Sequence, residues 1–237
     1  MNGFHTAIYS VMKRNNKRKE ILVSAIVIIR IKIMEVKNIV FDYGGVLVQY
    51  DFAGFFGKIL GSREKGQWLM DHVLPEQVNR DMDRELHPFS YYIRQQQDRW
   101  PEYADALDYF SHHYADVFTG ETPGMRQLMT DLREAGFHLY GLSNWSSKLA
   151  DVKARFSIFS LITDELISKD VHVIKPEPAI YQALLHKFDL NPDTCLFIDD
   201  KQENIDGCQS VGMHGFRFYP QQPLKSIAEI RRLLGVK

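Results

Sequence analysis

The feature that most constrains the fold of this 237-residue chain is a regular alternation of short apolar runs with helix-like segments. The apolar runs begin with VKNIVFDYG at 36–44 and continue with HLYGLSN, FSLIT, TCLFIDD and MHGFRFY. Helix-like segments separate them, among them TPGMRQLMTDLREAG, KPEPAIYQALLHKF and PLKSIAEIRRLLG. Alternation at this spacing predicts an α/β fold, a doubly wound parallel sheet with helices on both faces.

One long segment interrupts this alternation after the first predicted strand. Residues 52–119 are polar and aromatic and have the spacing of helices, as in FAGFFGKILG and EYADALDYFSHHYADVF. We therefore expect a core domain made of 36–51 and 120–237, with a helical domain of 52–119 inserted into it.

The first 35 residues do not fit the alternation either. A basic stretch, MKRNNKRKE, precedes ILVSAIVII, nine residues that are apolar except for one serine. This run is too short for a membrane-spanning helix, which needs roughly 20 apolar residues. Three interpretations of the extension stay open: a partly disordered tail, an export or anchor signal, and a true start at Met34.

The composition bears on the partners and the location of the protein. The formal net charge is −1, which provides no general attraction for nucleic acid or for an anionic membrane. The two cysteines, Cys195 and Cys208, lie in apolar runs without Cys-x-x-Cys spacing. This favours buried, reduced thiols over a disulfide or a metal site. We expect a cytoplasmic protein that binds neither nucleic acid nor membrane, and the sequence does not indicate its oligomeric state.

Polar residues follow three of the predicted strands. Asp42 ends the first, Ser143 and Asn144 end HLYGLSN, and Asp199 and Asp200 end TCLFIDD. The carboxyl ends of parallel strands meet at one edge of the sheet, where such folds carry their functional residues. We therefore expect these five side chains to form one site.

Each polar residue has a simpler interpretation when it is taken alone. A single aspartate at a strand end usually caps a helix or forms a turn, and a lone lysine is usually a solvated surface residue. His112 and His113 keep such an interpretation, because no carboxylate or cysteine stands at ligand spacing from them. Only the joint pattern predicts a site.

Four short motifs strengthen that pattern. FDYGGVL, GLSN, IKPEP and FIDD occur in this order between Phe41 and Asp200, on the expected elements. They resemble the four motifs of the haloacid dehalogenase superfamily, which has a Rossmann-like core, and the similarity extends from about Val36 to the C-terminus. The resemblance implies a magnesium-dependent phosphatase of small phosphate esters, with Asp42 as the nucleophile that becomes phosphorylated and with 52–119 as a helical cap.

The residue types suit this chemistry. A carboxylate at a strand end can attack phosphorus, and Lys175 supplies a fixed positive charge beside it, so Asp42 and Lys175 are the candidate catalytic residues. Glycines let backbone amides approach phosphoryl oxygens, and hydroxyl and amide side chains donate hydrogen bonds to them. The candidate phosphate-binding residues are Gly44, Gly45, Ser143, Asn144 and Lys175.

The acidic residues are candidates for a metal site. Asp199 and Asp200 offer hard oxygen ligands, which suit Mg²⁺ better than zinc. The resemblance implies that Asp200 is a direct ligand, together with Asp42 and the backbone carbonyl of Gly44. Two roles stay open for Asp199, which either binds the metal through water or holds Lys175.

The chain departs from the common family pattern at Gly44. Most superfamily phosphatases have an aspartate there, which protonates the leaving group. Asp51, a cap residue and solvent stay open as replacements. The pattern D-x-G-[GN]-V-[LI], followed by D-F, is similar to a subgroup that includes bacterial sugar-1-phosphate phosphatases and the phosphatase domain of epoxide hydrolases.

Three functions remain in consideration. The leading one is hydrolysis of sugar phosphates. The second is metal-independent dehalogenation of 2-haloacids, because true dehalogenases also lack the aspartate at Gly44; those enzymes, however, typically have no pair of acids in the fourth motif, and this chain keeps FIDD. The third is a catalytically impaired protein that binds phosphate esters.

The missing acid also predicts a substrate preference. If nothing replaces it, sugar-1-phosphates should react faster than 6-phosphates, because an anomeric hydroxyl leaves more easily.

Overall fold

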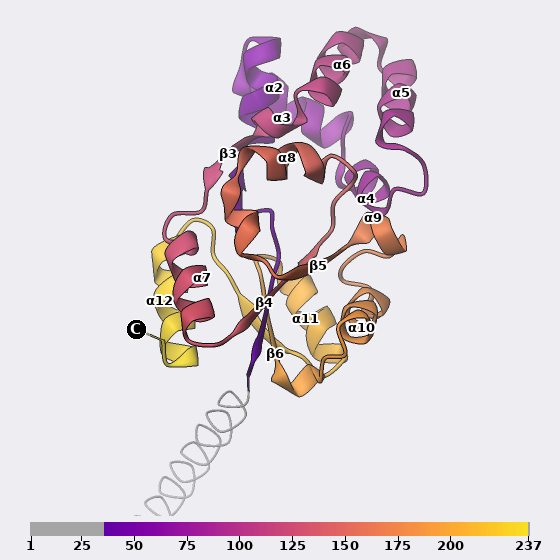
Figure 1. The fold of residues 1–237 in the computed structure, drawn as a ribbon. Helices are drawn as coiled ribbons and strands as arrows, with labels where there is room; N and C mark the ends of the chain where they lie inside the picture. The colour runs from indigo at the N-terminus through magenta and orange to yellow at the C-terminus, as the bar shows by residue number, and fades with distance from the viewer. Residues whose placement is uncertain (1–35, 237) are drawn as a thin grey trace, which may run out of the picture. The chain divides into compact units, whose positions relative to one another are not determined.

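The computed structural model describes residues 36–236, so the three interpretations of the N-terminal extension lie outside the described residues. Within that range five strands form one sheet in the order β5-β4-β1-β6-β7, and all four pairings are parallel (Figure 1). The strands are β1 (Asn38–Phe41), β4 (His138–Ser143), β5 (Asp164–Ile167), β6 (Cys195–Asp199) and β7 (His214–Arg217). The predicted α/β fold with a parallel sheet is confirmed.

The central strand β1 sets the position of the site. All four of its residues are buried, as expected for a strand that is covered on both faces. Phe41 pairs with Gly141 of β4 and with Ile198 of β6, so the next residue, Asp42, lies beside Leu142 and Asp199. The strand ends that carry the predicted site residues are therefore level with one another.

Helices cover both faces of the sheet. α10 (Pro178–Lys187) and α11 (Gln202–Ser210) lie on one face, and α7 (Met125–Glu134) and α12 (Pro223–Leu234) lie on the other (Figure 1). Val40 and Phe197 of the sheet pack with Ile180 and Leu184 of α10 and with Ile205 of α11 in one buried cluster. Burying a side chain of this size contributes about 1.5–3 kcal/mol, so these contacts hold the sheet and its ends in place.

A helical insertion interrupts the core after β1. The chain leaves through β2 (Val48–Tyr50) and returns through β3 (Phe118–Glu121), and these two strands pair antiparallel. Between them lie α2 (Phe52–Leu60), α3 (Arg63–His72), α4 (Glu76–Arg84), α5 (Phe89–Arg99) and α6 (Ala104–His112). Aromatic rings of Phe52, Phe56, Phe89 and Phe110 pack edge-on or tilted inside the insertion. The apolar spacing in this segment is thus accounted for by an aromatic core.

One predicted strand is wrong. The run FSLIT, expected as a strand, belongs largely to the 3-10 helix η3 (Ser157–Leu161), and β5 begins only at Asp164. Ile158 and Phe159 are buried in η3, next to α7 and α8 (Leu149–Arg155). A short apolar run indicates burial but does not by itself distinguish a strand from a buried turn.

The two cysteines are both buried and form no disulfide. Burial raises the pKa of the Cys195 thiol to about 11 and that of Cys208 to about 12. Because the thiolate is the reactive form, both side chains behave as small apolar core residues.

The helices of the described region are short. The longest, α12, has 12 residues. A transmembrane helix needs roughly 20. Among residues 36–236, no helix combines the length and apolarity that a membrane span requires.

Candidate active site

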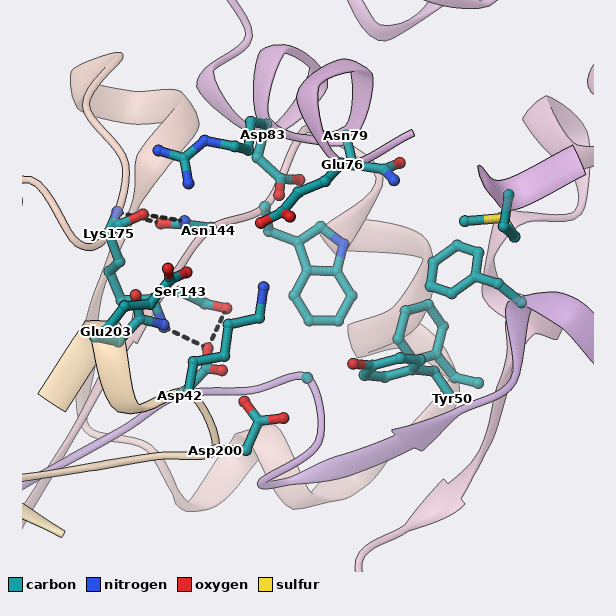
Figure 2. Close-up of a pocket in the computed structure, with 18 of the residues that line it drawn as sticks. Asp42, Tyr50, Glu76, Asn79, Asp83, Ser143, Asn144, Lys175, Asp200 and Glu203 are labelled. Atoms are coloured by element: carbon teal, nitrogen blue, oxygen red, sulfur yellow. Dashed lines mark hydrogen bonds and ion pairs between the residues drawn. The ribbon is translucent and has the colours of Figure 1, made fainter. Parts of the chain in front are cut away.

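The polar ends of β1, β4 and β6 meet at one edge of the sheet, beneath the helical insertion. Figure 2 shows Asp42, Ser143, Lys175 and Asp200 on one side of a shared pocket. The pocket has a volume of about 310 Å³. The structure therefore brings together residues that are 158 positions apart along the chain, from Asp42 to Asp200.

Asp42 is held by two donors. Oγ of Ser143 donates a hydrogen bond to Oδ1 of Asp42 at 2.8 Å, and Nζ of Lys175 lies 2.7 Å from the same oxygen. Burial raises the pKa of Asp42, and the charge of Lys175 opposes that rise. The second carboxylate oxygen, Oδ2, makes no hydrogen bond or ion pair within residues 36–236, so one oxygen is available for attack or for a metal.

Lys175 lies between two carboxylates. Its Nζ is 2.7 Å from Oδ2 of Asp199 and 3.1 Å from the carbonyl oxygen of Leu142. Burial disfavours the charge, but Asp199 and Asp42 outweigh burial and raise the pKa of the ammonium. The side chain is 2% exposed, so Lys175 is a fixed positive charge in the floor of the site.

Asp199 is fully buried and its oxygens are occupied. Besides Lys175, it accepts a hydrogen bond from the backbone amide of Lys201 at 2.8 Å. Nδ2 of Asn204 donates to both of its oxygens at 3.0 Å. These contacts favour the second of the two roles left open above, in which Asp199 holds Lys175.

The side chain of Asn144 lies against the backbone of Lys175. Its Nδ2 donates to the Lys175 carbonyl oxygen at 3.0 Å, and its Oδ1 accepts from the Lys175 amide at 2.7 Å. Asn144 therefore fixes the segment that carries the lysine, whereas the sequence pattern assigned it to phosphate.

Gly45 leaves space for Asp200, and its amide is not free to bind a ligand. Its amide, predicted above to approach phosphate, instead donates to the carbonyl oxygen of Val48 at 2.8 Å and closes the turn after β1. A Cβ atom at Gly45 would lie 2.8 Å from Oδ2 of Asp200, and φ is +78°. Only glycine fits here without displacing Asp200.

Gly44 opens toward the pocket. Within residues 36–236 its amide donates no hydrogen bond, so it remains available to a ligand. A Cβ atom here would lie 3.6 Å from the ring of Tyr50 and 3.9 Å from that of Trp145. The space where an aspartate would extend is thus bordered by two aromatic side chains.

Three carboxylates could hold a metal ion. Oxygens of Asp42, Asp199 and Asp200 all lie within 4.8 Å of one another. Burial raises the pKa of Asp200 to about 7, and Asp42 and Asp199 add to the rise. Concentrated negative charge with hard oxygen donors fits Mg²⁺. Because the oxygens of Asp199 are already occupied, the residues best placed to bind it are Asp42 and Asp200.

The pocket also contains residues that the sequence patterns missed. One face of α4 contributes Glu76, Asn79, Arg80 and Asp83. Asn79, Arg80 and Asp83 follow Glu76 by three, four and seven residues, which is the spacing of one helical face. The sequence does not show that this face borders the pocket. Tyr50, Phe52, Trp145 and Lys201 complete much of the remaining wall.

Three other residues considered in the sequence analysis lie outside the pocket. Asp51 caps α2 by accepting from the amide of Gly54 at 2.9 Å, and it forms a bidentate ion pair with Arg63. His112 ends α6 and His113 follows it, and both are exposed, as the simpler interpretation predicts. The argument that no carboxylate stands near them is wrong, because Nδ1 of His112 lies 3.7 Å from Asp108 and Nδ1 of His113 lies 3.5 Å from Asp116.

Comparisons with known proteins agree with this geometry. A family model of haloacid dehalogenase-like hydrolases matches residues 36–212. Phosphoglycolate phosphatase of Mannheimia succiniciproducens is 29% identical over 125 residues, which are 48% of this chain and 56% of that protein. Phosphatase MT3486 of Mycobacterium tuberculosis is 24% identical over 195 residues, 77% of this chain and 87% of that protein.

A dehalogenase is also similar to the chain. (S)-2-haloacid dehalogenase 4A of Burkholderia cepacia is 25% identical over 126 residues, 48% of this chain and 54% of that protein. In several matches the chain thus spans about half the length of the curated relative, or less.

Solved structures share the fold. A HAD-like family hydrolase from Porphyromonas gingivalis superposes with a TM-score of 0.66 at 19% identity, covering 84% of this chain and 98% of that one. A HAD family enzyme from Bacteroides thetaiotaomicron, in complex with magnesium and inorganic phosphate, gives 0.60 at 20% identity, covering 78% and 95%. At these identities the similarity concerns the fold alone.

Proposed function

The chain belongs to the haloacid dehalogenase-like hydrolases, and we propose that it is a magnesium-dependent phosphatase of small phosphate monoesters, with sugar phosphates as its substrate class. The observation that carries this proposal is the position of Asp42. Its carboxylate shares a ligand-sized space with Asp200 and lies 2.7 Å from a buried lysine. Phosphate esters need this combination of a nucleophile and concentrated positive charge.

In the first step Asp42 attacks phosphorus. The Oδ2 oxygen has no partner among the described residues, whereas Oδ1 is fixed by Ser143 and Lys175. The attack forms an Oδ–P bond and breaks the bond from phosphorus to the ester oxygen. In the second step water attacks the aspartyl-phosphate, releases inorganic phosphate and restores Asp42.

Charge neutralisation comes from fixed groups. Lys175 reduces the repulsion between the Asp42 carboxylate and the phosphoryl group. Gly44 lines the pocket, and its amide, which donates no hydrogen bond within residues 36–236, is available to the phosphoryl oxygens. Asp42, Asp200 and the Gly44 carbonyl would hold Mg²⁺, which when bound neutralises phosphoryl charge.

The helical insertion, 52–119, acts in this proposal as a cap that selects the substrate. Its helix α4 lines the pocket, and Arg84 at the end of that helix pairs with Glu177 of the core at 2.5 Å. The pocket offers polar contacts from Asn79 and Arg80 beside the rings of Tyr50 and Trp145. This mixture of donors and flat apolar faces suits a small sugar.

The test is hydrolysis of an aryl phosphate and of a panel of sugar phosphates with and without Mg²⁺. We expect phosphate release that requires Mg²⁺ and falls to background in Asp42→Asn, because the amide cannot attack as an anion. The variant should keep the melting temperature of the wild type within a few degrees. Full activity of Asp42→Asn would refute the assigned nucleophile.

The similarity to a haloacid dehalogenase supports a second candidate function. In that case the protein would release chloride from a 2-haloacid without any metal. Carboxylate oxygens within 4.8 Å of one another favour a site that contains a cation, and hence the phosphatase. Tight binding of a phosphate ester without turnover would instead indicate an impaired enzyme. The cytoplasmic location stays a prediction.

A further inference from the structure

The reaction proposed above needs a proton donor, and the sequence leaves three replacements open for the aspartate missing at Gly44: Asp51, a cap residue and solvent. Gly44 has no side chain. Asp51 lies outside the pocket, and hydrogen bonding to Arg63 lowers the pKa of its carboxyl, so it is ionised and has no proton to donate. A donor must stand on the side of phosphorus away from Asp42, because the attacking and leaving oxygens are roughly in line.

Two carboxyl groups of α4, those of Glu76 and Asp83, line the pocket, and Asp83 is the more buried of the two. Figure 2 shows Asp83 on the wall of the pocket opposite Asp42 and Asp200. It lies on the face of α4 that lines the pocket and is half-buried. Its carboxylate makes no hydrogen bond or ion pair within residues 36–236, so it is free to meet a ligand.

We infer that Asp83 is the general acid and base of this site, taking the place of the aspartate that Gly44 lacks. This inference rests on the proposed phosphatase function. It assigns a catalytic residue to the helical insertion, so the insertion would supply chemistry as well as substrate selection.

The position of Asp83 is fixed by contacts between α4 and the core. Its backbone carbonyl accepts a hydrogen bond from Oγ of Ser168 at 2.5 Å, and Ser168 also accepts one from the amide of Trp145. Glu85 accepts hydrogen bonds from the amide and the hydroxyl of Ser147 at 2.7 and 2.6 Å. A proton donor must be held within hydrogen-bond reach of its acceptor, and these contacts supply that rigidity.

The charges around Asp83 suit a group that carries a proton. Burial is the main cause that raises the pKa of Asp83 well above its ordinary value; Asp42 and Glu85 add to the rise, and Lys201 and Lys175 oppose it. Glu76, Arg80 and Tyr114 also line the pocket. A carboxyl whose pKa is raised holds its proton more readily and can donate it to a leaving oxygen.

Other acids in the pocket fit less well. Glu76 and Glu203 also line it, but both side chains are exposed to solvent. An exposed side chain is not held in the fixed position that a proton donor needs. Tyr50 is the strongest rival, because its ring borders Gly44. Burial and Asp200 raise the pKa of its phenol to about 12, so it could donate a proton but could not readily remove one from water.

The proton balances across both steps. As Asp42 forms its bond to phosphorus, the proton of Asp83 moves to the departing ester oxygen, which leaves as an alcohol. Asp83 is then a carboxylate. As water attacks the aspartyl-phosphate, its proton moves to Asp83, the bond between phosphorus and Asp42 breaks, and inorganic phosphate is released.

The test compares wild type with Asp83→Asn on Mg²⁺-dependent hydrolysis of esters whose leaving groups differ in acidity. For sugar and alkyl phosphates we expect kcat/KM to fall by about 100- to 10,000-fold, the usual contribution of general acid catalysis. For dinitrophenyl phosphate, whose leaving group needs no proton, the loss should stay below about tenfold. The variant should also release about one equivalent of dinitrophenol in a burst, because water attack has lost its base.

Matched variants separate this role from a structural one. Asp81→Asn makes the same change on α4, but Asp81 faces Gln77 rather than the pocket, so all esters should react as with wild type. Asp83→Glu keeps a carboxyl and should recover part of the alkyl activity. Three results would overturn the inference. Asp83→Asn could lose activity equally on all esters, or it could hydrolyse alkyl phosphates at the wild-type rate. The selective loss on alkyl phosphates could also appear in Tyr50→Phe instead. A wild type that hydrolyses no ester would overturn the proposed function itself.

Discussion

Nζ of Lys175 lies 2.7 Å from Oδ1 of Asp42, and the lysine side chain is only 2% exposed. The same nitrogen is 2.7 Å from the fully buried Asp199. One ammonium thus compensates two carboxylates in a place that water barely reaches. Such an arrangement ties the stability of the sheet edge to the residue that neutralises charge during catalysis.

Replacing this lysine should therefore destabilise the protein as well as inactivate it. Lys175→Met leaves Asp42 and Asp199 buried without a counter-charge, and breaking a buried ion pair typically costs about 3–5 kcal/mol. We expect a loss of this size in the free energy of unfolding, measured by denaturant titration without metal. The matched control is Lys169→Met, whose ion pair with Asp170 is partly exposed and should cost less than about 1 kcal/mol. Similar losses in both variants would contradict the buried-pair argument.

A methyl group at Gly45 should weaken metal binding. In Gly45→Ala the new Cβ would lie 2.8 Å from Oδ2 of Asp200, at a φ of +78° that alanine rarely adopts. We expect the Mg²⁺ concentration for half-maximal activity to rise by about tenfold, a typical effect of displacing a ligand. Gly120→Ala is the control, because nothing lies within 4 Å of a Cβ there. Unchanged Mg²⁺ dependence in Gly45→Ala would show that Asp200 is not a ligand.

Removing the charge of Asp51 should leave catalysis unaffected. The carboxylate caps α2 and pairs with Arg63 outside the pocket, and asparagine keeps the capping oxygen. We expect kcat/KM of Asp51→Asn within about threefold of wild type for alkyl and aryl phosphates alike, since no proton transfer is lost. A selective loss on alkyl phosphates would instead make Asp51 the acid and contradict the role of Asp83.

The sheet edge could be predicted from the sequence because its signals are local. Apolar runs that end in Asp42 and in Asp199 predict buried parallel strands, and the parallel arrangement then requires their ends to meet. The run FSLIT was misassigned because apolar character indicates burial and not backbone conformation.

The wall opposite Asp42 could not be predicted in the same way. Asp83 lies in a polar helix, and nothing in its neighbourhood in the sequence distinguishes it from Asp81, which faces Gln77. Only the docking of α4 on Ser147 and Ser168 determines which of its faces lines the pocket. The partners of Gly45 and Asn144 were missed for a similar reason, because the turn and the lysine segment satisfy those groups internally.

The last prediction concerns pH and follows from Asp200, whose pKa burial raises to about 7. In the unfolded chain an aspartate has a pKa of about 3.9. Between these values the folded, metal-free protein binds more protons than the unfolded one, so the contribution of Asp200 to stability rises as the pH falls from 8 to 5.

Mg²⁺ requires the carboxylate form of Asp200, so the apparent affinity for Mg²⁺ should be about tenfold weaker at pH 6 than well above pH 7. That factor is about 1.4 kcal/mol, or about 3–5 °C in melting temperature. We expect saturating Mg²⁺ to raise the melting temperature by that much more at pH 8 than at pH 6, and Asp200→Asn to remove most of the difference. Equal shifts at both pH values in the wild type would mean that Asp200 does not exchange its proton for the metal.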